Sequence, residues 1–415
     1  MTDIALSARS TTAALRALFP ETPLQRNDHL SARYGADIWL KREDLTPVRS
    51  YKLRGAFNAM RKMRDRQPDQ RQFVCASAGN HAQGVAYACR HFGVEGTIFM
   101  PVTTPQQKID KTRTFGGAQV RIELTGDYFD QTLAAAQAWC AERGAHFLSP
   151  FDDPDVIEGQ ASVAVELLDQ LGRAPDLVVL PVGGGGLASG VTGFLRAVAP
   201  TVDFRFVEPL GGASLTAALQ AGGPVKLAQI NSFVDGAAVA RLGDLTYAAL
   251  RWVRPDQVLL APEDRICGTM LEMLNVEGIV LEPAGALSVD VLPELAETIR
   301  GKTVVCVTSG GNFDFERLPE VKERAQRFAG LKKYFILRMP QRPGALREFL
   351  NMLGPNDDIT RFEYLKKSAR NFGSVLIGIE TRDADGFARF TGRMDAAGLA
   401  FRDITRDEAL SEFLI

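Results

Sequence analysis

The sequence predicts an α/β fold with parallel sheets, followed by a smaller α+β domain. Short apolar runs alternate with helical patterns as far as about residue 315, an order typical of parallel sheets covered by helices on both faces. A charged, helix-prone segment over 316–333 predicts a linker, and over 334–415 the order of elements changes to βαββαβ. We therefore expect a two-lobed first domain over 1–315, with a small lobe inserted at about 55–150, and a separate second domain.

The strands of the first domain are predicted from short apolar runs, and its helices from the patterns between them. The runs expected to form buried strands are 71–77, 96–101, 118–124, 176–182, 203–209 and 302–309. Helices are expected over 81–93 and 128–144, and the second of these ends in a glycine, as helix C-termini often do.

The second domain is predicted to be ferredoxin-like. Strands are expected over 334–340, 358–367, 373–382 and 399–404, with helices over 344–354 and 383–398. This order does not continue the pattern of the first domain, so the second domain is expected to be an independent module.

Composition excludes several classes of function. A net charge of −2 and a pI near 6.2 give no reason to expect nucleic acid or an anionic membrane as a partner. No apolar run approaches the roughly 18 residues of a membrane span, and the N-terminus has no signal-peptide core. Five scattered cysteines without a C-x-x-C pair, and four histidines without metal-binding spacing, argue for reduced thiols in a cytoplasm and for no metal site.

Four consecutive glycines carry the strongest functional signal. The strand over 176–182 runs directly into Gly183, Gly184, Gly185 and Gly186, and a helical pattern follows from Leu187. Without side chains, backbone N–H groups at a helix start can approach an anion closely, and phosphate is the natural ligand. The alternative is a flexible turn without a ligand, which would lose conformational entropy on folding for no gain.

A dinucleotide site is the rival interpretation of this stretch. Gly183, Gly185 and Ala188 satisfy a G-x-G-x-x-A spacing, and Glu208 ends the next strand, where such folds place the acid that binds a ribose. This interpretation predicts a nicotinamide or flavin enzyme, but it gives no role to Lys52.

Two further strand ends carry small polar residues. The strand over 71–77 leads into Ser77, Ala78, Gly79, Asn80 and His81, which form either ordinary helix caps or a nest for a carboxylate, with Asn80 free to bond a ring hydroxyl. The strand over 302–309 ends at Ser309, either a turn former or a neutral hydroxyl for a ring nitrogen. All three stretches lie at the carboxyl ends of strands, where α/β folds bind ligands.

Lys52 combines with these stretches to indicate one cofactor. Pyridoxal phosphate needs a lysine for a Schiff base, a phosphate cradle, and partners for its ring oxygen and ring nitrogen. A solvated surface lysine is the ordinary alternative for Lys52 alone, but it leaves the other three elements without a common purpose.

The motifs together resemble a known family, the biosynthetic threonine dehydratases (threonine ammonia-lyases) of the tryptophan-synthase-β-like group of pyridoxal-phosphate enzymes. The resemblance rests on LKREDLTPVRSYKLRGAF (40–57), SAGNHAQGVA (77–86), FDDPDVIEGQ (151–160), PVGGGGLASG (181–190), LEPAGA (281–286) and TSGGN (308–312). The tail resembles the single-copy ACT-like regulatory domain of that family. Tyr51 stands where phenylalanine is common, and GQAS (159–162) departs from the usual Gly-Thr.

The resemblance assigns a role to each candidate residue. It implies that Lys52 carries the cofactor and then acts as the base, that Asn80 bonds the ring oxygen, and that Ser309 faces the ring nitrogen. Gly183, Gly184, Gly185, Gly186 and Leu187 would hold the phosphate, and the loop Ser77, Ala78, Gly79, Asn80 and His81 would hold the substrate carboxylate. A neutral hydroxyl at Ser309 suits rapid β-elimination better than a carboxylate would, which is a hypothesis that an aspartate substitution tests.

The implied reaction is the deamination of L-threonine to 2-oxobutanoate, the first step of isoleucine biosynthesis. The tail implies feedback inhibition by isoleucine, with the RPGAL turn (342–346) near the ligand, and the family implies a homotetramer. A serine dehydratase or serine racemase remains the alternative enzyme. A non-catalytic amino-acid sensor is a third reading, which the intact Lys52 opposes.

Overall fold

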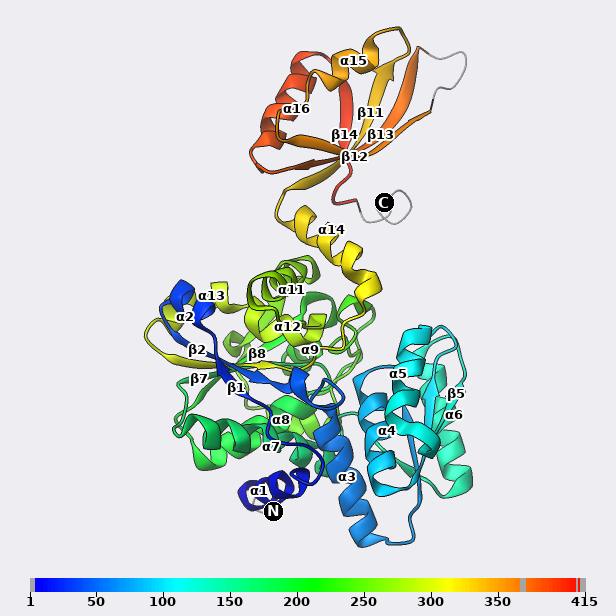
Figure 1. Ribbon diagram of the computed structural model, residues 1–415, viewed down its shortest axis with the longest axis vertical. Coiled ribbons are helices and arrows are strands. Elements are labelled where there is room, and N and C mark those ends of the chain that lie inside the picture. The colour runs from blue at the N-terminus through cyan, green and yellow to red at the C-terminus, as the bar shows by residue number, and fades with distance from the viewer. Residues whose placement is uncertain (1–3, 366–370, 408–409, 411–415) are drawn as a thin grey trace. The chain divides into compact units, whose positions relative to one another are not determined.

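Three sheets organise the chain, one of six strands and two of four, in the part of the structure that is described (Figure 1). That part comprises residues 4–365, 371–407 and 410 of a computed structural model. The chain divides into two units, Met1–Asp314 and Phe315–Ile415. The first unit holds the six-stranded sheet and one four-stranded sheet, which we call the large lobe and the small lobe.

The large-lobe sheet has the order β1-β2-β10-β7-β8-β9, and every pair is parallel except β1 with β2. Its strands are β1 (Leu24–Arg26), β2 (Asp37–Arg42), β7 (Leu177–Pro181), β8 (Asp203–Pro209), β9 (Val258–Ala261) and β10 (Thr303–Thr308). The predictions over 176–182, 203–209 and 302–309 are confirmed by β7, β8 and β10. β2 was not predicted, because Lys41 and Arg42 give this stretch the look of a polar segment, although both side chains are buried.

Helices cover both faces of this sheet. Figure 1 shows α7 and α8 on one side and α11 and α12 on the other. Alternate residues Val178 and Leu180 of β7 pack with Phe194 of α8 and Val163 of α7 in one core. The helices of the large lobe are α1 (Ile4–Leu15), α2 (Asp28–Tyr34), α7 (Pro154–Leu171), α8 (Gly186–Val198), α9 (Ser214–Ala221), α10 (Asp244–Leu250), α11 (Glu263–Glu277), α12 (Pro283–Asp290) and α13 (Leu292–Ile299).

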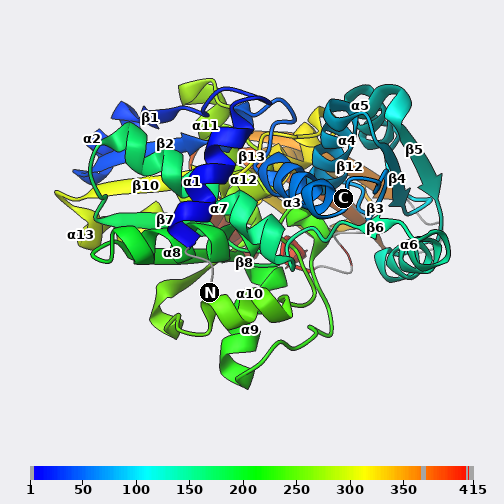
Figure 2. The same ribbon diagram turned by 90° about the horizontal axis from the view of Figure 1, so that it is seen from below.

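The small-lobe sheet is entirely parallel, in the order β5-β4-β3-β6. Its elements are α3 (Lys52–Arg66), β3 (Gln72–Ala76), α4 (Asn80–Phe92), β4 (Glu95–Met100), α5 (Gln106–Gly116), β5 (Val120–Leu124), α6 (Phe129–Arg143) and β6 (His146–Phe147). Phe73 and Cys75 point into the core beside α4, whereas Val74 and Ala76 point toward α6. Figure 2 shows α4 and α6 on opposite faces accordingly. The predicted strands over 71–77, 96–101 and 118–124 are confirmed.

The second unit is an antiparallel sheet in the order β12-β13-β11-β14, with two helices on one face. Its elements are α14 (Leu318–Phe328), β11 (Lys332–Pro340), α15 (Ala345–Leu350), β12 (Asp357–Leu365), β13 (Phe372–Thr381), α16 (Gly386–Ala396) and β14 (Ala400–Asp403). Phe335, Leu337 and Met339 alternate along β11 and pack against Phe349 and Phe390 of the two helices. The predicted ferredoxin-like order is confirmed. The end of the strand expected over 358–367 lies outside the described residues.

A search of the described helices for membrane-spanning candidates found none with the length and apolar character required.

Candidate active site

Lys52 is the first residue of α3, where the small lobe leaves the large one. Its Nζ donates a hydrogen bond to the carbonyl oxygen of Pro150 at 2.9 Å. The amine also lies 5.3 Å from the ring centroid of Tyr51 and 5.9 Å from that of Phe151. Burial disfavours the ammonium form and lowers the pKa of Lys52 to about 8, while the negative charge of Glu282 acts in the opposite direction. The neutral amine is therefore more populated near physiological pH than it is for an exposed lysine, although the ammonium form still predominates.

The glycine loop joins β7 to α8 and leaves no room for side chains. A Cβ on Gly184 would lie 2.2 Å from the ring of Phe151, and one on Gly183 would lie 2.9 Å from the Cα of Ala237. Gly185 has a φ of +89°, in the left-handed region that glycine adopts without strain. The loop can therefore have this shape only with glycines at these positions.

The amides of the glycine loop are unpaired. Among the described residues, no protein acceptor receives the N–H groups from Gly183 to Leu187, although most of this loop is buried. Ser214 donates to the carbonyl oxygen of Gly183 at 3.1 Å and Thr246 to that of Gly184 at 2.8 Å. Because C=O and N–H point in opposite directions across a trans peptide, these two bonds turn the following N–H groups the other way. Buried, convergent and unpaired amides at a helix start form an anion site.

The loop from Ser77 to His81 joins β3 to the start of α4. The amide of Gly79 donates to the hydroxyl of Ser77 at 3.2 Å, while the N–H groups of Ala78, Asn80 and His81 have no acceptor in the described part of the chain. The imidazole of His81 is hydrogen-bonded to the carbonyl oxygen of Leu148 at 2.9 Å. Burial and the nearby charge of Lys52 lower the pKa of His81 to about 3, so its ring is neutral. What this loop offers an anion is its backbone.

Asn80 and Ser309 approach one another through residues that the sequence analysis did not single out. The side chain of Asn80 donates to Glu282 Oε1 at 2.6 Å and accepts from Asn312 Nδ2 at 2.8 Å. A Cβ on Gly310, the residue after Ser309, would lie 2.1 Å from the same Glu282 oxygen. The hydroxyl of Ser309 donates to the carbonyl oxygen of Ala284 at 3.2 Å. Glu282 thus lies between the two predicted ring partners.

Residues 148–152, which follow β6, connect the remaining parts of the site. Leu148 binds His81, and Pro150 binds Lys52. The ring of Phe151 fills the space above Gly184, and the Cβ and backbone of Phe151 lie against Gly186. The structure therefore brings Lys52, the glycine loop, the Ser77–His81 loop and Ser309 into one site. Only the FDDPDVIEGQ motif pointed to this segment, and no single residue in it carries a chemical signature.

Glu282 is the other residue that was missed. It immediately precedes α12, it is 5% exposed, and burial raises its pKa to about 8, with the charge of Asp235 adding to the effect. Its place in the LEPAGA motif was noted, but a glutamate before a proline at a helix start is also an ordinary helix-start residue.

Glu208 does not have the freedom that the dinucleotide interpretation requires. Its carboxylate is buried and accepts the amides of Leu215 at 2.6 Å and Thr216 at 2.9 Å, at the start of α9. It also accepts the hydroxyl of Thr216 at 2.7 Å. The carboxylate of Glu208 therefore already binds the start of α9, and it is not free to bind a ribose at this sheet edge.

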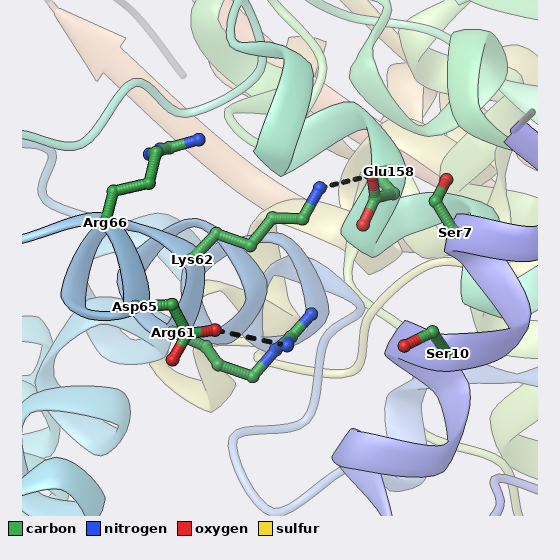
Figure 3. A pocket seen from close by; sticks show the side chains of 7 residues that line it. All are labelled: Ser7, Ser10, Arg61, Lys62, Asp65, Arg66 and Glu158. Atoms are coloured by element: carbon green, nitrogen blue, oxygen red, sulfur yellow. Dashed lines mark hydrogen bonds and ion pairs between the residues drawn. The ribbon is translucent and has the colours of Figure 1, made fainter. Parts of the chain in front are cut away.

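A separate polar pocket lies far from Lys52, between α1, α3 and α7 (Figure 3). It has a volume of about 320 Å³, and its lining residues are Ser7, Ser10, Arg61, Lys62, Asp65, Arg66 and Glu158. Its charged side chains are all paired, since Lys62 pairs with Glu158 at 2.6 Å, Arg61 with Asp65 at 3.5 Å, and Arg66 with the neighbouring Asp155 at 2.6 Å. Nine residues of α3 separate Arg61 from Lys52, about 14 Å along a helix. Among the described residues, no three His, Cys, Asp or Glu side chains form a metal-binding group.

The donor set fits pyridoxal phosphate. The unpaired amides of the glycine loop suit a phosphate, the partly neutral Lys52 suits attachment to an aldehyde, and Asn80 and Ser309 offer polar groups for a ring. Residues 16–310 match the family described as pyridoxal-phosphate-dependent enzyme, and residues 323–414 match the C-terminal regulatory domain of threonine dehydratase. The fold and the site define this chain as a pyridoxal-phosphate-dependent enzyme with a regulatory domain.

Curated relatives narrow the class further. The biosynthetic L-threonine dehydratase IlvA of Bacillus subtilis is 49% identical over 395 residues, covering 95% of this chain and 93% of the relative. The enzyme of the same name from Staphylococcus aureus is 45% identical, covering 92% of this chain and 91% of its own. The chain belongs to the family of biosynthetic threonine dehydratases.

Solved structures agree with this assignment. The processed form of threonine deaminase isoform 2 from Solanum lycopersicum superposes with a TM-score of 0.72 at 36% identity, covering 78% of this chain and 94% of that one. Maize serine racemase superposes with a TM-score of 0.70 at 26% identity, covering 78% of this chain and 98% of that one.

Proposed function

We propose that this protein deaminates L-threonine to 2-oxobutanoate and ammonia, the first step of isoleucine biosynthesis. The observation that carries the proposal is the convergence of a partly neutral lysine and a set of buried, unpaired amides in a chain whose full-length relatives are named for this activity. We propose a catalytic domain over 1–315 with its small lobe at about 55–150, a linker over 316–333 and a regulatory domain over 334–415.

The cofactor's ring, when bound, supplies an electron sink that stabilises negative charge at the carbon bearing the amine. Lys52 would hold the cofactor covalently, the amides from Gly183 to Leu187 would bind its phosphate, and Asn80 would bond its ring oxygen. Ser309 would face the ring nitrogen as a neutral partner. Phe151, above the glycine loop, would exclude water from the phosphate end of the site.

Lys52 would act as the base that removes the proton from Cα of threonine. A lysine can do this only while its Nζ is neutral, and burial brings its pKa to about 8. The carbonyl of Pro150 orients the free amine, because it accepts a hydrogen bond from one N–H of Nζ.

The substrate carboxylate would bind at the start of α4. Unpaired amides and the positive end of the helix suit a carboxylate, and the neutral His81 ring adds no charge that could bind it elsewhere. The Ser77–His81 loop would thereby hold the Cα–H bond of the substrate toward Lys52.

The direct test is incubation of the purified protein with L-threonine and detection of 2-oxobutanoate. We expect a yellow protein that forms 2-oxobutanoate from threonine faster than it forms pyruvate from serine. Its similarity to a serine racemase keeps a serine-specific enzyme as the second candidate, and a preference for serine would favour it. A colourless protein that copurifies with a dinucleotide would contradict both.

The role of Ser309 has its own test. Replacement by aspartate would put a negative charge beside the ring nitrogen and hold a proton on it, so S309D should lose most dehydratase activity. If S309D retained full activity, a neutral partner would not matter.

The second unit is proposed to bind isoleucine and lower the activity of the first. Gly344, in the RPGAL turn, has a φ of +86° and begins α15, so a side chain there would strain the turn at which a ligand could approach. Isoleucine must then bind the less active state more tightly. Isoleucine should raise the threonine concentration needed for half-maximal rate, and removal of residues 334–415 should abolish that effect. We further propose a cytoplasmic homotetramer, for which sedimentation should give four times the 45.3 kDa of the chain.

A further inference from the structure

A chain of hydrogen bonds runs through the side chain of Asn80. Asn312 Nδ2 donates to the carbonyl oxygen of Val48 at 2.7 Å and to Asn80 Oδ1 at 2.8 Å. Asn80 Nδ2 in turn donates to Glu282 Oε1 at 2.6 Å. Val48 is 0% exposed and Glu282 is 5% exposed, whereas Asn80 and Asn312 are half-buried, so the two ends of the chain are shielded from bulk water.

The direction of this chain follows from the chemistry of its two ends. The carbonyl of Val48 can only accept, so the Asn312 atom that faces it must be the amide nitrogen. That nitrogen has two hydrogens, and the second one meets Asn80, which must therefore present its oxygen. Asn80 then presents its nitrogen to Glu282, whose Oε1 can accept whether or not the carboxyl group holds a proton. Each amide consequently has one orientation.

The members of the chain come from both lobes. Asn80 starts α4 of the small lobe, whereas Asn312 follows β10 of the large-lobe sheet and Glu282 precedes α12. Glu282 is tied to the ring-nitrogen side as well, because its backbone N–H donates to the carbonyl oxygen of Gly310 at 3.2 Å. Residues of the large lobe therefore bind both the oxygen and the nitrogen of the Asn80 side chain, which belongs to the small lobe.

We propose that Asn312 and Glu282 are positioning residues that hold the Asn80 amide with its second N–H directed at the cofactor's ring oxygen. This inference rests on the proposed function for the contact between Asn80 and that oxygen. Without Asn312, no donor meets the Asn80 oxygen, and the amide can turn by half a rotation and present that oxygen to the ring oxygen, so that two acceptors meet. Without Glu282, no acceptor directs the Asn80 nitrogen, and the amide is held only at its oxygen. The ring then loses a donor on one side, and the large lobe loses its hold on the start of α4.

The test compares the holoenzymes of N312A, E282A and E282Q with a matched control, N58A. Asn58 is similarly bonded, since its Nδ2 donates to the carbonyl of Asp155 at 2.8 Å and to Glu158 at 3.2 Å, and it is more deeply buried than Asn312. It lies on α3 and does not contact Asn80. The measurements are the visible absorption of the bound cofactor as a function of pH, the dissociation constant of the cofactor, and the melting temperature.

N312A and E282A should weaken cofactor binding about tenfold, the loss expected for one hydrogen bond within a buried polar network. Both should also shift the pH midpoint of the cofactor absorption. E282Q keeps an acceptor for Asn80 and should change both quantities less than E282A does. N58A should lower the melting temperature and leave the absorption midpoint where it is in the wild type.

The inference is overturned if N312A melts like N58A and keeps the wild-type absorption midpoint and cofactor affinity. Such a result in an enzyme that still forms 2-oxobutanoate would leave the proposed function intact. A wild-type enzyme that forms no 2-oxobutanoate would instead contradict the proposed function, whatever the spectra of the variants.

Discussion

Two clusters of buried charge lie near the start of α3, and they differ in whether the charges have counter-ions. The buried ion network comprises Lys41, Glu43, Arg54 and Glu166, all 0% exposed. Arg54 pairs with Glu43 and with Glu166, each at 2.7 Å, and Lys41 pairs with Glu166 at 2.8 Å. Ser162, from the unusual GQAS stretch, accepts a further hydrogen bond from Arg54 at 3.0 Å.

The second cluster is the candidate active site, where Lys52 and Glu282 have only neutral hydrogen-bond partners among the described residues. Pro150 accepts from Lys52, and Asn80 donates to Glu282. Burial therefore moves both pKa values toward neutrality, each to about 8. In the ion network the pKa of Arg54 is raised and that of Glu166 is lowered, because each faces opposite charge. Lys52 and Arg54 lie two positions apart on α3. Burial makes the amine of Lys52 easier to deprotonate because no counter-ion among the described residues binds it, whereas the paired Arg54 stays charged.

The largest expected effect is the loss of Lys52. K52A should lower the rate of 2-oxobutanoate formation by about 10⁴-fold, because it removes both the attachment of the cofactor and the proposed base. Borohydride should trap the cofactor on residue 52 of the wild-type protein and leave K52A unlabelled. Near-normal turnover in K52A would contradict the proposal that the lysine without a counter-ion is the reactive one.

The ion network should show its effect in stability rather than in chemistry. R54M leaves Glu43 and Glu166 buried without their main counter-ion, so the free energy of unfolding should fall by about 3–5 kcal/mol. Denaturant unfolding of the apoenzyme measures this loss. R61M, on the same helix, removes a more exposed cation paired with Asp65 at 3.5 Å and should cost less than about 1 kcal/mol. Equal losses in the two variants would contradict the distinction between buried and exposed pairs.

The unpaired cluster should give the apoenzyme a characteristic dependence of stability on pH. Glu282 binds its proton more tightly when folded, with a pKa of about 8 instead of about 4.3, so stability should fall as pH rises between these values. Lys52 binds its proton less tightly in the folded protein, with a pKa of about 8 instead of about 10.4 in the unfolded chain. The stability that Lys52 contributes should therefore rise with pH between these two values.

Melting temperatures of single variants separate these two contributions. E282Q should flatten the fall on the acid side of pH 8, and K52M should flatten the rise on the alkaline side. If E282Q kept the wild-type profile below pH 8, or K52M kept it above pH 8, the replaced residue would not have the shifted pKa that its burial predicts.

The smallest effect is expected for an exposed pair between the lobes. Lys226 and Asp130 lie 2.7 Å apart with side chains 63% and 73% exposed, so water screens their attraction. K226A should change the free energy of unfolding by no more than about 0.5 kcal/mol, and added salt should abolish that difference. If K226A lost as much free energy of unfolding as R54M, burial would not determine how strongly a charge pair stabilises the fold.

Much of the fold could be predicted because its signals are local. The apolar runs of β3, β4, β7, β8 and β10 and the change of order at the second unit are visible in the printed chain. The strand β2 was not predictable in this way. The charge of Lys41 is buried only because Glu166, 125 residues further along the chain, neutralises it, whereas Arg42 pairs with the nearby Asp44. A local pattern of polarity cannot report a counter-ion that lies more than a hundred residues away.

The same distinction holds for the site. The sequence by itself identified the glycine loop, Lys52, Asn80 and Ser309 as candidate site residues, because each belongs to a short motif at a strand end or helix start. Only the tertiary structure decided that Glu208 caps α9 and that Glu282 and Asn312 grip Asn80. It also decided that the partly buried amine of Lys52 lies beside a carbonyl instead of a carboxylate. The physical reason is that a pKa and an amide orientation depend on what surrounds a group in space, and folding brings those surroundings from the whole chain.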